Sequence, residues 1–147
     1  MEKISRSLAE TETIARDFLT RLAAKRKTGR AATIIGLRGD LGAGKTAFTQ
    51  AVARILGIKD KVQSPTFVLI RNYVILKNHW RKLVHIDCYR LASGADLLKL
   101  GWRELTATPT NLIFIEWPER VTELLPPETS RIYFEFINET GRKIIYD

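Results

Sequence analysis

A glycine-rich segment between an apolar run and an amphipathic run constrains this chain more than any other feature. The segment, Gly39-Asp40-Leu41-Gly42-Ala43-Gly44-Lys45-Thr46, matches the pattern G-x-x-x-x-G-K-[ST] at every position. The preceding run, 31–37, is short and apolar with branched side chains, which predicts a buried strand. The following run, 45–56, has apolar residues at helical spacing and stops at Gly57, which predicts a helix. Strand, loop and helix in this order predict a P-loop.

Each residue type in this segment suits the binding of a nucleoside triphosphate. Glycines adopt positive φ and let the backbone approach phosphate closely. The loop amides and the start of the helix, including Ala47, form a nest for anions. Lys45 supplies a charge to the terminal phosphates, and the Thr46 hydroxyl suits Mg²⁺. We therefore expect ATP and Mg²⁺ as ligands and ATP hydrolysis as the reaction. The alternative is a glycine-rich turn without a ligand.

The remaining patterns predict both helices and strands. Ser7-Leu8-Ala9-Glu10 has the form of a capping box, and the helix after it repeats apolar residues on one face before Gly29. A short helix is predicted at 95–100, and strands at 67–76, 81–86, 111–115, 131–137 and 142–146. Strands alternate with helices in the first half, and hairpins dominate the second. This order predicts a single domain, 1–147, with a P-loop NTPase-like α/β sandwich and a mixed parallel and antiparallel sheet flanked by helices.

Two acidic residues stand at the ends of predicted apolar strands. Glu116 follows the run 112–115, and Asp87 follows the run 83–86. Ligands of α/β sheets bind at the carboxyl ends of strands, and a P-loop site needs an acid there to fix its metal. The alternative for either residue is an acid paired with a nearby Arg or Lys. Finding both beside a complete P-loop pattern favours the metal site.

Three further features lie near these acids in the sequence. Strand alternation puts His85 on the same face as Asp87, and we interpret it as a core or sheet-face histidine rather than a base. Trp117 either stacks near the nucleotide or packs on the sheet. Ser64-Pro65-Thr66-Phe67 is a hydroxyl-rich, proline-stiffened loop that suits a γ-phosphate switch, or else a Ser-Pro turn that begins a strand.

Charge and cysteine content limit the partners. Lys and Arg number 24 against 16 Asp and Glu, and the pI near 9.9 favours RNA, DNA or acidic protein faces. The densest cluster, Lys25-Arg26-Lys27 with Arg30, is alternatively a solvated helix end. The single cysteine, Cys88, excludes an internal disulfide and a cysteine metal cluster. The first six residues lack the apolar core of a signal peptide, and no apolar run approaches roughly 20 residues, so we expect a cytoplasmic protein with no membrane role.

Taken together, four motifs resemble the TsaE family, formerly YjeE. They are the glycine-rich segment, Ser64-Pro65-Thr66-Phe67, His85-Ile86-Asp87-Cys88-Tyr89-Arg90-Leu91 and Ile115-Glu116-Trp117-Pro118-Glu119, in the family's order and spacing over nearly the whole chain. The resemblance implies an ATPase of bacterial tRNA modification. It would work with TsaD and TsaB, which place threonylcarbamoyl on the adenosine beside the anticodon, and tRNA would be a partner indirectly through that complex. The sequence leaves open whether the chain touches tRNA directly.

The resemblance also implies roles for individual residues. Thr46 and Glu116 would hold Mg²⁺, and Asp87 would act at the phosphate end. The switch would consist of Ser64 and Thr66. The catalytic candidates are Lys45, Asp87, Glu116 and Thr66.

Other positions add to the resemblance or depart from it. Thr11 and Arg142 are similar to family positions near the base and ribose. Cys88 stands where an apolar residue is usual, which should be harmless. The turn Lys77–Lys82 is more basic and aromatic than the family pattern, as a partner-specific contact would be.

Two other functions stay open on the sequence. A small-molecule P-loop kinase needs an acceptor site and usually an Arg-rich lid, and 147 residues are few for both. A non-catalytic, RNA-associated nucleotide sensor needs only the loop. A GTPase is disfavoured because the chain has no Asn-Lys-x-Asp motif. Products formed from labelled ATP separate the three readings: free phosphate, a phosphorylated acceptor, or no turnover.

Overall fold

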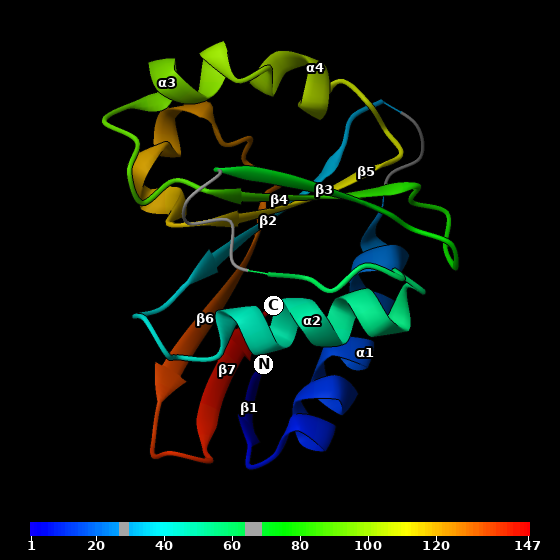
Figure 1. Ribbon diagram of the computed structural model, residues 1–147, viewed down its shortest axis with the longest axis vertical. Helices are drawn as coiled ribbons and strands as arrows, with labels where there is room; N and C mark the ends of the chain where they lie inside the picture. Colours follow the sequence, from blue (N-terminus) through cyan, green and yellow to red (C-terminus); the bar gives the residue numbers. More distant parts are fainter. Residues whose placement is uncertain (27–29, 64–68) are drawn as a thin grey trace.

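The computed structural model describes residues 1–26, 30–63 and 69–147. Its strands form one sheet in the order β1-β7-β6-β2-β5-β4-β3 (Figure 1). The strands are β1 (Glu2–Ser5), β2 (Thr33–Arg38), β3 (Ile70–Val74), β4 (Lys82–Asp87), β5 (Asn111–Glu116), β6 (Ser130–Phe136) and β7 (Arg142–Tyr146). The helices are α1 (Leu8–Lys25), α2 (Lys45–Ile55), α3 (Gly94–Lys99) and α4 (Trp102–Thr106), with 3₁₀ turns at Pro118–Arg120 and Thr122–Leu124.

The sheet is parallel at its centre and antiparallel at its margins. Strands β6, β2, β5 and β4 are parallel neighbours, while β3 pairs antiparallel with β4, and β7 with β6 and β1. Every residue of β5 is buried, as expected for a parallel strand covered on both faces. The predicted α/β fold with a mixed sheet is confirmed.

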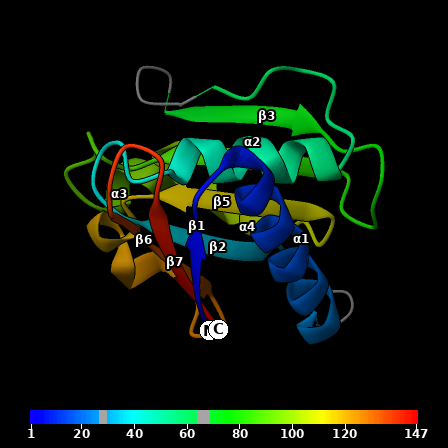
Figure 2. The ribbon, with the colours of Figure 1, turned by 90° about the horizontal axis from the view of Figure 1, so that it is seen from below.

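Helices cover both faces of the sheet (Figures 1 and 2). On one face, Phe18 of α1 and Phe48 of α2 belong to the same buried cluster as Phe114 of β5. On the other, Leu97 of α3 and Trp102 of α4 belong to the same cluster as alternate residues of the central strands. Alternation along a strand therefore decides which layer each side chain enters. None of the described helices is long and apolar enough to cross a bilayer.

The two main helices begin differently. Ser7 Oγ accepts a hydrogen bond from the Glu10 amide at 3.1 Å, and Glu10 Oε2 accepts one from the Arg6 amide at 2.6 Å, so the predicted capping pair forms. Helix α2 begins after Gly44, whose φ of 105° is left-handed and which has no side chain to cap the first turn. The first amides of a helix have no partner within it, so those of α2 can donate to a bound anion.

Two parts of the fold were not predicted, and one predicted strand has different bounds. Strand β1 has three exposed residues out of four and no apolar alternation, and it forms by pairing with β7. Helix α4 has only 5 residues, and the 3₁₀ turns have 3 each. The strand predicted at 67–76 spans only Ile70–Val74 in the described residues, and Phe67 lies outside them. The other boundaries agree within two residues.

Candidate nucleotide site

The glycine-rich loop joins the end of β2 to the start of α2. Gly39, Gly42 and Gly44 have φ angles of 152°, 79° and 105°, which L side chains rarely adopt. A Cβ on Gly39 would also lie 2.7 Å from the Phe134 carbonyl oxygen. Glycine is therefore required at 39 by space as well as by backbone conformation.

The non-glycine residues of the loop occupy distinct places. The Ala43 amide donates to the Asp40 carbonyl at 3.1 Å, which closes a turn inside the loop. Ala43 is buried, whereas Leu41 is 82% exposed at the surface of the loop. Thr46 and Ala47 follow Lys45 in the first turn of α2 and are half-buried.

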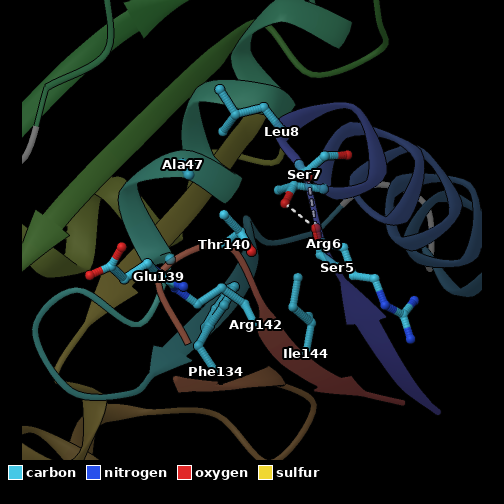
Figure 3. Close-up of a pocket in the computed structure, with 12 residues that line it drawn as sticks. Ser5, Arg6, Ser7, Leu8, Ala47, Phe134, Glu139, Thr140, Arg142 and Ile144 are labelled. Carbon is cyan, nitrogen blue, oxygen red and sulfur yellow. Dashed lines mark hydrogen bonds between the residues drawn. The ribbon is translucent and has the colours of Figure 1, made fainter. Parts of the chain in front are cut away.

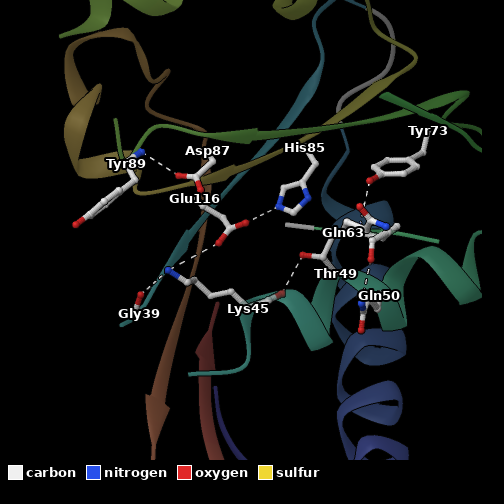
Figure 4. Close-up of polar contacts among 11 residues, drawn as sticks. Gly39, Lys45, Thr49, Gln50, Gln63, Tyr73, His85, Asp87, Tyr89 and Glu116 are labelled. Atoms are coloured by element: carbon white, nitrogen blue, oxygen red, sulfur yellow. Dashed lines mark hydrogen bonds and ion pairs between the residues drawn. The ribbon is translucent and has the colours of Figure 1, made fainter. Parts of the chain in front are cut away.

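Lys45 lies across the loop instead of pointing into solvent (Figure 4). Its side chain is only 5% exposed, and Nζ donates to the Gly39 carbonyl at 2.5 Å. The same Nζ lies 3.8 Å from Glu116 Oε1 and 4.6 Å from the centroid of the Trp117 ring. A buried ammonium group needs such partners, and a phosphate over the loop would be one more.

The register of two parallel strands brings the predicted acids together. Asp87 of β4 pairs directly with Glu116 of β5, and His85 lies two residues earlier on β4. Leu83 and Phe114, in the same alternation, belong to the core beneath α1 and α2. All three polar side chains are buried and face the layer that carries Lys45.

Glu116 is held from two sides. Its Oε2 lies 2.7 Å from His85 Nε2, and its Oε1 faces Lys45. Beneath them on α2, the Thr49 hydroxyl donates to the Lys45 carbonyl at 3.0 Å. His85 is fully buried, as expected from the sequence, but its bond to Glu116 was not predicted. In the sequence, the only indication that His85 faces this site is its spacing of two residues from Asp87, which puts both side chains on one face of the strand.

An aromatic pair borders Lys45 and the acids. Trp117 has a left-handed φ of 59°, rare for a non-glycine residue, and its ring centroid lies 5.1 Å from that of Tyr89. Trp117 also packs against the apolar cluster under α3 and α4, so it contacts both the sheet core and Lys45. The Tyr89 amide donates to Asp87 Oδ1 at 2.9 Å.

The donor set near Lys45 suits Mg²⁺ only together with a phosphate. Mg²⁺ usually takes one or two protein oxygens and completes its shell with phosphate oxygens and water. Glu116 Oε1 and the Thr46 hydroxyl are oxygen donors of this kind. Within the described residues, no group of three or more His, Cys, Asp or Glu side chains is arranged to hold a metal by itself.

A cavity of about 410 Å³ adjoins the loop (Figure 3). It lies between the start of α1, the start of α2 and the β6–β7 hairpin. Thr11, Gly44, Ala47 and Arg142 line it together with Ser5, Arg6, Ser7, Leu8, Phe134, Glu139, Thr140 and Ile144. Cavities of this size accommodate small organic ligands. Thr11 and Arg142, far apart in the sequence, thus line one cavity beside the loop.

Polar contacts fix the walls of this cavity. Arg142 Nε donates to the Gly42 carbonyl at 3.0 Å, and its Nη1 donates to the Asn138 carbonyl at 2.6 Å, so it ties the loop to the hairpin. The hydroxyls of Ser5 and Thr11 are 2.6 Å apart. The predicted switch residues Ser64 and Thr66 lie outside the described residues, so their role stays a prediction.

Comparison with known proteins gives consistent matches. The profile of the family described as "Threonylcarbamoyl adenosine biosynthesis protein TsaE" matches residues 5–144. The chain is 39% identical over 113 residues to the tRNA threonylcarbamoyladenosine biosynthesis protein TsaE of Treponema pallidum, covering 76% of this chain and 79% of that one. It is 38% identical over 110 residues to the protein of the same name from Rickettsia felis, covering 74% of this chain and 61% of that one. The crystal structure of Bacillus subtilis YdiB superposes with a TM-score of 0.70 at 28% identity, over 99% of this chain and 83% of that one.

Proposed function

The chain belongs to the TsaE family of tRNA threonylcarbamoyladenosine biosynthesis proteins, and we propose that its task there is to bind ATP with Mg²⁺ and hydrolyse it. In this role it supports a TsaB–TsaD complex without transferring the threonylcarbamoyl group itself. The observation that carries the proposal is the buried Lys45, whose Nζ spans from the Gly39 carbonyl to Glu116. A lysine held over a loop of left-handed glycines is the arrangement that triphosphate binding requires.

The triphosphate would lie on the loop. The first amides of α2 and the loop amides would donate to phosphate oxygens, and the α2 dipole would add positive potential. Lys45 would turn from the Gly39 carbonyl toward the terminal phosphates. The glycines keep the loop free of side chains where phosphate approaches, since a Cβ at 44 would also meet Arg142 at 3.3 Å.

Mg²⁺ would be held by Thr46 and Glu116, and when bound it neutralises charge on the phosphates. His85 keeps Glu116 oriented with Oε1 toward the loop. Asp87 is the second buried carboxylate at this edge and is the candidate for positioning the attacking water. Both acids come from central strands, so their backbone positions are rigid.

The cavity beside the loop is the proposed site of the base and ribose. The hydroxyls of Ser5 and Thr11 and the fixed guanidinium of Arg142 supply polar groups on walls that also include Phe134 and Ile144. A few convergent polar groups in an apolar wall are typical of ligand pockets. The cavity supports a nucleotide as the ligand rather than inorganic polyphosphate.

Hydrolysis by the isolated chain should be slow. Transition-state charge in P-loop enzymes is often stabilised by an arginine supplied in trans. Two arginines beside the loop already have other contacts: Arg38, which ends β2, pairs with Glu119 at 3.3 Å, and Arg142 donates to the Gly42 carbonyl. The partners would complete the site and order the switch at Ser64 and Thr66.

Product analysis tests this function against a kinase or a non-catalytic sensor. Labelled ATP is incubated with the chain alone, with TsaB and TsaD, and with all three, and Thr66→Ala is assayed beside the parent. We expect slow phosphate release alone, faster release with the pair, and loss of most of that stimulation in Thr66→Ala with ATP binding retained. Transfer to an acceptor, no turnover, or fast turnover indifferent to the pair would contradict the accessory role.

A further inference from the structure

Two basic segments far apart in the sequence lie at the end of the sheet opposite the nucleotide site. Lys25 and Arg26 end α1, Arg30 precedes β2, and the turn Lys77–Lys82 joins β3 to β4. In both ribbon views, the α1 C-terminus and the β3–β4 turn lie on one side and the glycine-rich loop on the other (Figures 1 and 2). The 6 residues of β2 separate the two ends by roughly 20 Å.

Direct contacts join these segments. Arg26 Cζ lies 6.0 Å from the centroid of the Trp80 ring, in the middle of the basic turn. Arg26 Nη2 donates to the Pro109 carbonyl at 3.5 Å, and the next carbonyl, of Thr110, accepts from the Arg81 amide at 2.8 Å. The two residues before β5, Pro109 and Thr110, therefore bind both basic segments through their carbonyls. We name Lys25, Arg26, Arg30, Arg81 and Lys82 the basic end.

A groove of about 890 Å³ opens at the basic end. Lys25, Arg26 and Arg30 line it, and Glu128 is its only acidic wall residue among those described. The Thr129 side chain also lines the groove, is 6% exposed, and has no hydrogen-bond partner for its Oγ1 within the described part of the chain. That oxygen is itself covered by the protein, so the groove presents mainly its cations, which suit an anionic ligand.

Apart from Arg26, the cations of the basic end are available to an anionic ligand. Lys25, Arg30, Arg81 and Lys82 are exposed. None of the ion pairs formed between described residues includes them. Partial desolvation, and secondarily the charge of Arg26, lowers the pKa of the exposed His79, so this histidine adds less positive charge than an ordinary one.

We propose that the basic end binds the phosphate backbone of RNA, with tRNA as the ligand, in direct contact and independently of the nucleotide site. Backbone recognition relies on Lys and Arg, whereas the centre of a protein interface is depleted of charge. The aromatic residue of the turn, Trp80, is fully buried and cannot stack on a base. Binding should therefore be insensitive to base sequence and strongly dependent on salt.

The test compares two triple variants of the full chain that remove the same charge. Lys25→Gln with Arg30→Gln and Lys82→Gln changes the basic end, while Lys3→Gln with Arg16→Gln and Lys99→Gln changes exposed cations elsewhere. The affinity for fluorescently labelled, unmodified tRNA is measured by anisotropy between about 50 and 200 mM salt. We expect the first variant to bind about tenfold or more weakly with a salt slope smaller by about 3, and the control to change by only about twofold.

The outcomes separate this inference from the ATPase proposal. ATP affinity, measured by calorimetry on the same variants, should be unchanged, because the groove lies at the other end of the sheet. Equal weakening by both triples would show that only net charge attracts tRNA and would overturn the inference. Failure of the parent to bind tRNA would also overturn it. If the first triple then lost only its response to TsaB and TsaD, the surface would face an acidic protein instead. Failure of the parent to bind ATP would reject the ATPase proposal and leave the tRNA result standing.

Discussion

Nε2 of His85 lies 2.7 Å from Oε2 of Glu116 on the neighbouring parallel strand. Both residues are buried, with 0% and 5% of their surfaces exposed. A buried carboxylate is stable only when it is hydrogen-bonded or paired with a cation. His85 thus fixes the direction of Glu116 and leaves Oε1 facing the loop, where the metal would bind.

Replacing His85 should weaken the response to Mg²⁺ more than nucleotide binding itself. His85→Leu removes the donor to Glu116, and loss of a partner that orients a metal ligand typically costs about 10–100-fold in metal affinity. His85→Gln keeps an amide donor and should retain part of the response. The measurement is ATP affinity by calorimetry over a series of Mg²⁺ concentrations. If both variants lost ATP binding equally without metal, His85 would be only a packing residue.

Glu116→Gln should impair Mg²⁺-dependent hydrolysis and spare metal-free binding. The amide is nearly isosteric and can still accept from His85, but it lacks the negative charge with which a carboxylate attracts Mg²⁺. Phosphate release with excess Mg²⁺ and nucleotide binding in EDTA give the two readouts. Similar losses in both would identify Glu116 as a structural partner of Lys45, the alternative left open by the sequence.

Lys45→Ala should abolish tight ATP binding without unfolding the protein. Each lost charge-assisted phosphate contact is worth about 1.5–3 kcal/mol, or roughly 10–100-fold in affinity. Glu116 keeps its hydrogen bond to His85, so the variant leaves no isolated buried charge. Calorimetric titration measures binding, and a thermal melt checks the fold. Lys99→Ala, on the exposed side of α3, is the control and should match the parent. Unchanged affinity in Lys45→Ala would reject the P-loop assignment.

The parts of the site that depend on local sequence could be predicted. The conformation of the loop depends on its own glycines, so one octapeptide predicts a strand, a loop and a helix in this order. Asp87 and Glu116 were identifiable because each ends an apolar run, and parallel strands end at the same edge. Helices α1 and α2 followed from apolar periodicity because each buries one face.

Features that depend on strand register or distant contacts could not be predicted from the sequence. The bond between His85 and Glu116 exists only because β4 and β5 pair in one register. Resemblance suggested Thr11 and Arg142, but no spacing rule places residues from opposite ends of the chain on one cavity. The sequence does not indicate that the two basic clusters lie side by side, because the contact of Arg26 with Trp80 exists only in the folded chain. Strand β1 lacks a pattern of its own and forms through β7.

A hydrogen bond from Tyr146 on β7 to Asp17 on α1 should make stability depend on pH. Tyr146 Oη donates to Asp17 Oδ2 at 2.6 Å, and this bond, more than the nearby Arg21, lowers the pKa of Asp17 against the opposing effect of burial. Burial, with the bond to Asp17, raises the pKa of Tyr146. Both shifts favour the folded state with Asp17 charged and Tyr146 neutral.

The Tyr146→Phe variant tests this coupling by urea unfolding at several pH values. At pH 7 it should be less stable than the parent by about 1 kcal/mol, a modest figure because Asp17 is 43% exposed. A lowered acid pKa stabilises the fold above its unfolded value of 3.8, so the difference should shrink as the pH falls below that value and Asp17 is protonated in both states. Above pH 10, Tyr146 ionises in the unfolded parent before it ionises in the folded one, which lowers the stability of the parent. The variant lacks this hydroxyl, so the difference in stability between the two proteins should narrow again. Tyr133→Phe, at an exposed position on β6, is the control and should show no such maximum. A difference between Tyr146→Phe and the parent that stayed constant from acid to alkaline pH would mean that the hydroxyl is not bonded to the ionised Asp17.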